Sequence, residues 1–195
     1  VIDAKDDLSI QVHPDDAYAK VHENGSLGKT ECWFILDCKE NATLVVGHNA
    51  KTKEELEQMI HEGRWKEFIR EIPIKPGDFI QIDPGTVHAI KGGTLLLETQ
   101  QSSDITYRVY DYDRLSNGKP RQLHIVQSID VITVPAKSAD NSVVHIEKKD
   151  DAIQQLIQCP YYTVYRIDVE HRVETWQDKP FALMSVVEGL SLIHI

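Results

Sequence analysis

The sequence predicts a mainly β protein, folded as an antiparallel sandwich or barrel. Short runs of β-branched and aromatic residues alternate with turn-forming residues along most of the chain, and few helical patterns separate them. A parallel sheet would need a crossover helix between consecutive strands, which this pattern does not supply. Expected strands cover residues 8–12, 32–36, 43–46, 78–82, 94–98 and 105–110.

Two helical stretches interrupt the strands. The first, over residues 14–22, opens with a proline followed by Asp15 and Asp16, residues that suit a helix N-terminus. The second begins at Thr52, which forms a capping-box pattern with Glu55 before apolar residues at helical spacing. We expect this helical insertion to span about residues 52–70 and its apolar side to pack against the barrel.

The length and polarity of the chain predict its domain organisation. With 195 residues and 41% hydrophobic content, the chain can bury one large core and part of a second. Polar residues concentrate between 136 and 151, which indicates a linker, and strand-like runs resume at 161–169 and 181–187. We therefore expect a barrel over residues 1–135, a linker over 136–151, and the start of a second, truncated β-domain over 152–195.

Composition narrows the classes of partner and the compartment. No apolar run approaches the roughly 20 residues that cross a bilayer, so no membrane association is expected. The net charge of −10, without clustered lysines and arginines, disfavours nucleic acid. The chain begins without a methionine or a recognisable signal peptide, and we expect a fragment. The cysteines are odd in number and lack metal-binding spacing, which favours reduced thiols and the cytoplasm: Cys32, Cys38 and Cys159.

Four polar residues spread over three expected strands form a candidate metal site. Gln11 and His13 lie two apart on one strand, so their side chains share a face. Glu31 precedes an apolar run, where a carboxylate is costly unless it is paired or bound to a cation. His88 follows a Pro84–Gly85 turn and starts the next strand. Two histidines and a carboxylate with open positions suit a catalytic divalent metal rather than a closed structural zinc site, although each residue alone also fits a structural role.

Four segments, LSIQVHPDD, GKTECW, GDFIQIDPGTVHAI and TYRVYD, resemble those of type I mannose-6-phosphate isomerases. The third also resembles the second cupin motif. The similarity covers about residues 8–112, with the compact spacing of the shorter bacterial branch. It implies a cupin-type jelly-roll barrel with one Zn²⁺ ion per chain and assigns functions to seven positions. The implied metal ligands are Gln11, His13, Glu31 and His88, and the implied pocket residues are Arg108, Lys29 and Glu98.

The resemblance also implies a reaction, the interconversion of mannose 6-phosphate and fructose 6-phosphate through a cis-enediol. A metal with open positions stabilises the negative charge that develops on the neighbouring oxygens. Glu98 is our candidate for the proton-transferring base, provided that burial raises its pKa. Arg108 is expected to hold either the enediolate oxygens or the substrate phosphate, and Lys29 offers a point charge for the same task.

Two other functions remain open on the sequence. Two histidines and one carboxylate also form the facial triad of non-haem iron oxygenases, so a metal-dependent cupin oxygenase is one alternative. A sugar-binding cupin without turnover is the other. An iron that consumes oxygen would indicate the oxygenase, and loss of the catalytic polar residues would indicate the binding protein. Lys29, Glu98 and Arg108 are all present, which favours an enzyme.

Overall fold

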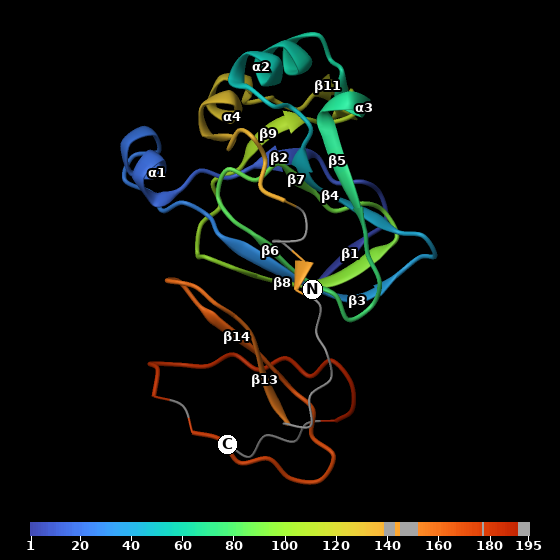
Figure 1. The fold of residues 1–195 in the computed structure, drawn as a ribbon, viewed down its shortest axis with the longest axis vertical. Coiled ribbons are helices and arrows are strands. Elements are labelled where there is room, and N and C mark those ends of the chain that lie inside the picture. Colours follow the sequence, from blue (N-terminus) through green and yellow to red (C-terminus); the bar gives the residue numbers. More distant parts are fainter. Residues whose placement is uncertain (139–142, 145–151, 177, 191–195) are drawn as a thin grey trace.

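Two five-stranded antiparallel sheets face each other in the computed structural model, which describes residues 1–138, 143–144, 152–176 and 178–190 (Figure 1). The first sheet has the order β1-β8-β3-β6-β12 and the second β5-β4-β7-β2-β9. The mainly β, antiparallel fold predicted from the sequence is confirmed. In sheet order, the strands are β1 (Ile2–Ala4), β8 (Thr94–Gln100), β3 (Glu31–Cys38), β6 (Phe79–Ile82) and β12 (Val143–Val144), then β5 (Ile69–Pro73), β4 (Thr43–His48), β7 (His88–Ala89), β2 (Ile10–Val12) and β9 (Tyr107–Tyr110).

The main core fills the space between the two sheets. Along β3, Trp33 and Ile35 point inward and meet Leu44 of the facing sheet in one buried cluster. The alternate residues Cys32 and Phe34 belong to a different cluster on the outer face of the same sheet. This period-two alternation places Glu31, two residues before Trp33, on the inward face as well.

Helices cover the outer face of the second sheet. These are α2 (Lys53–His61), α3 (Trp65–Phe68) and α4 (Ile125–Val131), while α1 (Asp16–His22) lies to one side (Figure 1). The predicted cap of α2 is present, because the Glu55 amide donates to Thr52 Oγ1 at 3.2 Å. The Glu55 carboxylate reaches the amide of Lys51 rather than that of Thr52. The sequence did not reveal α4, which lacks a side-chain cap and contributes Ile129 to the core.

Two segments differ from the expected elements. The helical insertion ends in a strand, since Ile69–Pro73 forms β5 and pairs with β4. The expected strand over residues 181–187 is wrong, because this stretch contains no strand. It pairs with no described strand, and its large apolar side chains are exposed, Phe181 at 72% and Leu183 at 90%.

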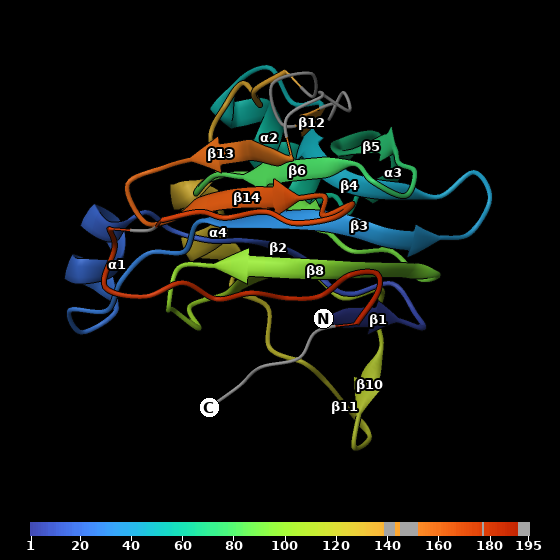
Figure 2. The ribbon, with the colours of Figure 1, turned by 90° about the horizontal axis from the view of Figure 1, so that it is seen from below.

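A separate hairpin packs on the outer face of the first sheet. It consists of β13 (Ile153–Gln158) and β14 (Thr163–Ile167), and Figure 2 shows it lying over β6 and β3. Leu156 and Tyr162 of the hairpin region contact the cluster of Cys32 and Phe79. Most of the predicted linker, residues 139–142 and 145–151, lies outside the described residues, so the domain division stays a proposal. Among the described helices, none has the length and apolar character needed to cross a membrane.

Candidate metal centre

Three of the predicted ligands meet between the two sheets. Glu31 is the first residue of β3, His88 is the first residue of β7, and His13 directly follows β2. His13 Nε2 lies 3.4 Å from Glu31 Oε2, and His88 Nε2 lies 3.4 Å from Glu31 Oε1. Within the described residues, these three side chains alone form a His/Cys/Asp/Glu group whose ligand atoms lie close enough to hold a metal, all within 4.8 Å of one another.

Backbone hydrogen bonds orient both imidazole rings. His13 Nδ1 donates to the carbonyl of Ile105 at 2.8 Å, and His88 Nδ1 donates to the carbonyl of Thr86 at 2.8 Å. Because a carbonyl can only accept, each ring carries a proton on Nδ1 and directs its Nε2 toward Glu31. Metal-binding histidines in proteins are commonly oriented by such bonds.

The electrostatics of the group call for a cation. His13 and Glu31 are each 1% exposed and His88 is fully buried. Burial lowers the pKa of His88 to about 4, so this ring is neutral near pH 7. Burial alone would raise the pKa of Glu31, but His13, His88 and Lys29 outweigh it and hold this pKa below its ordinary value. A neutral imidazole and an ionised carboxylate therefore face each other through lone pairs.

Unsatisfied atoms lead to the same conclusion. Among the described residues, neither carboxylate oxygen of Glu31 nor His13 Nε2 has a hydrogen-bond partner. Lys29 Nζ lies 3.0 Å from Glu31 Oε2 as an ion pair but does not satisfy the oxygen as a hydrogen-bond donor. Leaving a carboxylate or a ring nitrogen without a hydrogen-bond partner in a core costs roughly several kcal/mol. A divalent cation bound between these groups would remove that cost. The donor set of two nitrogens and one carboxylate fits such an ion.

Gln11 lies beside this group but presents its amide nitrogen. Its Nε2 is 3.3 Å from His88 Nε2, and Gln11 and His88 are directly opposite each other in the β2–β7 pair. As a metal ligand it would present its oxygen instead, which a half-turn of the amide about its terminal bond would bring into place.

Lys29 and Glu98, the two predicted pocket residues near Glu31, differ in their surroundings. Lys29 is 9% exposed, and its amide donates to the carbonyl of Pro14 at 3.0 Å. Glu98 is half-buried opposite Trp33, whose Nε1 donates to Glu98 Oε2 at 3.2 Å. Burial first, and the charge of Glu31 second, raise the pKa of Glu98 above its ordinary value. Trp33, which the sequence did not single out, thus orients Glu98 and also packs edge-on against His88.

Arg108 belongs to the same face of the second sheet but lies further from the histidines. Gln11 pairs with His88 on one side and with Arg108 on the other, so the three side chains form a row across β7, β2 and β9. Arg108 Nη1 donates to the carbonyl of Gln122 at 2.9 Å. The structure therefore brings His13, Glu31, His88, Gln11 and Lys29 together, and places Arg108 at the end of the row.

A second charged cluster, not predicted from the sequence, adjoins Arg108. Asp111 is 4% exposed, and its carboxylate accepts from Arg114 Nη2 at 2.5 Å and from Arg121 Nε at 2.7 Å. The short hairpin of β10 (Leu115–Ser116) and β11 (Lys119–Pro120) places residues 114 and 121 opposite each other. The sequence does carry a signal for this hairpin, the Asn117–Gly118 pair with φ of 53° and 77°, which is typical of a tight β-turn.

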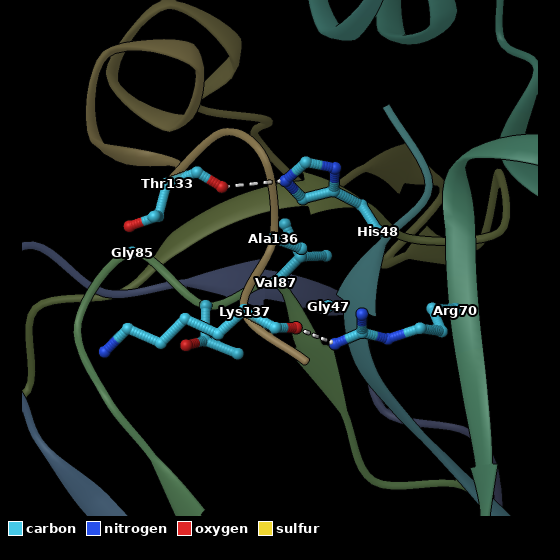
Figure 3. Close-up of a pocket in the computed structure, with 9 residues that line it drawn as sticks. Gly47, His48, Arg70, Gly85, Val87, Thr133, Ala136 and Lys137 are labelled. Atoms are coloured by element: carbon cyan, nitrogen blue, oxygen red, sulfur yellow. Dashed lines mark hydrogen bonds between the residues drawn. The ribbon is translucent and has the colours of Figure 1, made fainter. Parts of the chain in front are cut away.

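A small pocket lies among β4, β5, the turn before β7 and the segment after α4 (Figure 3). Its room is about 10 Å³, which suits a single water molecule rather than a sugar phosphate. His48 Nε2 donates to the carbonyl of Thr133 and Arg70 Nη2 to that of Lys137, at 2.9 and 2.7 Å. These bonds fasten the segment after α4 to the second sheet, which is a structural function.

Known proteins similar in sequence are mannose-6-phosphate isomerases, the family that the sequence motifs resemble. No protein-family model matches the chain. The mannose-6-phosphate isomerase ManA of Bacillus subtilis is 52% identical over 190 residues, which cover 97% of this chain and 60% of that protein. The mannose-6-phosphate isomerase of Streptococcus mutans is 47% identical over 196 residues, which cover 100% of this chain and 61% of that protein.

Solved structures agree with the sequence comparison. The crystal structure of the mannose 6-phosphate isomerase from Bacillus subtilis matches with a TM-score of 0.75 at 50% identity, over 83% of this chain and 52% of that one. A variant of the phosphomannose isomerase from Salmonella typhimurium matches with a TM-score of 0.62 at 14% identity, over 78% and 57% of the two chains, a likeness that shows the fold alone. The chain spans about 60% of the length of the curated relatives it matches, and over that length it is similar in sequence and fold to mannose-6-phosphate isomerases.

Proposed function

We propose that this chain carries the metal centre of a mannose-6-phosphate isomerase and that the protein interconverts mannose 6-phosphate and fructose 6-phosphate. The observation that carries the proposal is the buried group of His13, Glu31 and His88, in which two oriented imidazole nitrogens and two unsatisfied carboxylate oxygens converge. Similarity to named isomerases supports the reaction.

We infer that one Zn²⁺ ion per chain is held by His13, Glu31 and His88, with Gln11 as a fourth ligand through its oxygen. When bound, the ion supplies Lewis-acid stabilisation of negative charge on the sugar oxygens. Zinc accepts mixed nitrogen and oxygen ligands and performs no redox chemistry, as an aldose–ketose isomerisation requires. The protein's own residues bind the sugar and move the proton.

Glu98 is our proposed base. It is half-buried, is held by Trp33 Nε1, and has a raised pKa, which brings a carboxylate closer to the range where it exchanges protons efficiently near neutrality. The base would take the proton from one of the carbons C1 and C2 and return it to the other. The positive charge of Lys29 lowers the pKa of Glu98 and so opposes the effect of Glu31 on it.

Lys29 and Arg108 are proposed to bind substrate oxygens at different points. Lys29 lies at the metal end of the site, 3.0 Å from Glu31, where a fixed cation stabilises the charge of an enediolate. Arg108 lies at the other end of the row of His88, Gln11 and Arg108, where its planar fork suits oxygens further along the sugar chain.

A coupled assay tests the reaction. The purified chain is assayed with mannose 6-phosphate after chelation and again after zinc is added, and we expect zinc to restore formation of fructose 6-phosphate. Arg108→Ala should keep its zinc and lose turnover by orders of magnitude; unchanged turnover would remove Arg108 from the mechanism. Bound iron and oxygen uptake would indicate the oxygenase instead. Metal binding without product would indicate a sugar-binding cupin or a need for the remaining length of the relatives.

The remaining proposals concern partners and location. We propose a sugar phosphate as the small-molecule ligand, with neither nucleic acid nor membrane as a partner. The described cysteines are free thiols, which fits the proposed reducing compartment, the cytoplasm.

A further inference from the structure

Two guanidinium groups, those of Arg114 and Arg121, share the carboxylate of Asp111, and a third, that of Arg108, lies near them. Asp111 is the hydrogen-bond and ion-pair partner of Arg114 and Arg121, while Arg108 has no carboxylate within ion-pair distance among the described residues. In a chain whose net charge is −10, this is a local excess of positive charge. Such an arrangement costs free energy through repulsion unless an anion occupies it.

The three arginines differ in how many of their guanidinium nitrogens donate hydrogen bonds. Arg114 is fully engaged: Nε donates to the carbonyl of Asp111, Nη1 to that of Asp7, and Nη2 to the Asp111 carboxylate. Arg121 donates through Nε and Nη2, and its Nη1 makes no hydrogen bond to the described part of the chain. Arg108 donates through Nη1 to Gln122, while its Nε is buried without a partner there.

Arg108 and Arg121 are neighbours with unused donors. The carbonyl that Arg108 Nη1 contacts belongs to Gln122, the residue directly after Arg121. The side chain of Arg121 is 40% exposed, so an anion can reach it from solvent. Arg121 is also the largest charge effect that lowers the pKa of Arg108, after burial, which agrees with two like charges held close together.

We propose that Arg121, together with Arg108, binds the phosphate group of the sugar phosphate, and that Asp111 and Arg114 hold Arg121 in position. This inference rests on the proposed function and names the part of the site that recognises the phosphate. Two planar guanidinium forks match the three terminal oxygens of a phosphate monoester.

The position of the pair fits the chemistry of the substrate. A six-carbon sugar reacts at C1 and C2 and carries its phosphate at C6, so reaction and recognition must occur at opposite ends of the bound molecule. His88, Gln11 and Arg108 lie on three adjacent strands, and strand spacing puts the backbones of His88 and Arg108 about 10 Å apart. Arg121 directly follows β11 and precedes Gln122, whose carbonyl accepts from Arg108.

Calorimetric titration of the zinc-loaded chain with mannose 6-phosphate, mannose and inorganic phosphate tests the proposal. Arg121→Gln should weaken binding of mannose 6-phosphate and inorganic phosphate about tenfold, the effect of one lost charge-assisted contact. Binding of mannose and zinc content should not change. Arg166→Gln is the matched control, since Arg166 is 37% exposed, pairs with Asp168 and lies on β14. Arg121→Lys, which keeps the charge but not the fork, should weaken phosphate binding by less than Arg121→Gln.

Unchanged affinity of Arg121→Gln for mannose 6-phosphate would overturn the inference, as would an equal loss of mannose binding or of zinc. Failure of the wild-type chain to bind any phosphate compound would also overturn it. If Arg121→Gln does not fold, the titration is made with Arg121→Lys instead. Wild-type affinity of that variant for mannose 6-phosphate would then contradict the proposal. Arg121-dependent binding without formation of fructose 6-phosphate would reject the proposed reaction but keep the phosphate subsite. Product formation with an unchanged KM in Arg121→Gln would support the proposed reaction but reject the phosphate subsite.

Discussion

Glu31 and Asp111 are both buried carboxylates next to basic side chains, yet their surroundings differ in one respect. Asp111 accepts hydrogen bonds from two guanidinium groups and has its oxygens satisfied. Glu31 faces two imidazole nitrogens and forms an ion pair with Lys29, and its oxygens accept no hydrogen bond in the described part of the chain. The comparison separates a carboxylate whose hydrogen bonds the protein itself completes from one that belongs to a group able to hold a metal ion.

The difference has an electrostatic counterpart. The hydrogen bond from Arg121 lowers the pKa of Asp111 most, burial opposes it, and the contribution of Arg114 leaves this pKa at about 2. For Glu31, burial is the largest effect and acts against the charge, so the carboxylate stays ionised only through its basic neighbours. Asp111 therefore serves structure and positioning, and Glu31 serves the proposed metal.

The largest expected effect is on zinc affinity. Glu31→Gln removes the only carboxylate of the His13–Glu31–His88 group and should weaken zinc binding at least about 100-fold, because the ion loses its sole charged ligand. Asp111→Asn, which also neutralises a buried carboxylate, should keep wild-type affinity. Equilibrium dialysis against a zinc chelator measures both. An equal loss of zinc affinity in the two variants would contradict the proposal that Glu31, and not Asp111, binds the metal.

Zinc should also stabilise the folded chain. At a free zinc concentration of 100 times Kd, binding to the native state alone adds about 2.7 kcal/mol to the free energy of unfolding. Urea unfolding of the chelated and zinc-loaded chain measures this gain. His88→Ala should show no gain, and a zinc-dependent shift of the same size in that variant would place the ion elsewhere.

These expectations show which parts of the site the sequence could predict. Gln11, His13, Glu31 and His88 were predicted because period-two spacing and a local turn determine which way strand side chains point. Asp111 and its arginines were missed because their contacts depend on the turn at Asn117–Gly118 and on pairing across the hairpin. The strand expected over residues 181–187 failed for a related reason, since an apolar run forms a strand only where a partner strand exists.

A smaller effect concerns the stability of the Asp111 cluster. Asp111→Asn should lower the free energy of unfolding by about 1–2 kcal/mol, less than for a fully buried ion pair because the arginine side chains are 38% and 40% exposed. Denaturant unfolding of the chelated proteins gives this value. A loss below about 0.3 kcal/mol would mean that the ion pairs are too well solvated to hold the hairpin.

The smallest expected effect is a loss of folding stability at acidic pH. The pKa of Asp111 is lowered to about 2 in the folded chain, so its contribution to stability is present above the unfolded value of about 3.9 and is lost as pH falls toward 2. Wild-type stability should therefore decline more than that of Asp111→Asn between about pH 4 and pH 2. Parallel pH profiles of unfolding in the two proteins would show that Asp111 is not selectively stabilised in its charged form.

Calorimetric titration of the chelated wild-type chain with zinc tests whether Glu31 and its two histidines bind a cation. We expect a single tight site per chain that disappears in both His13→Ala and His88→Ala. Absence of binding to the wild-type chain, or a site that survives both substitutions, would contradict it.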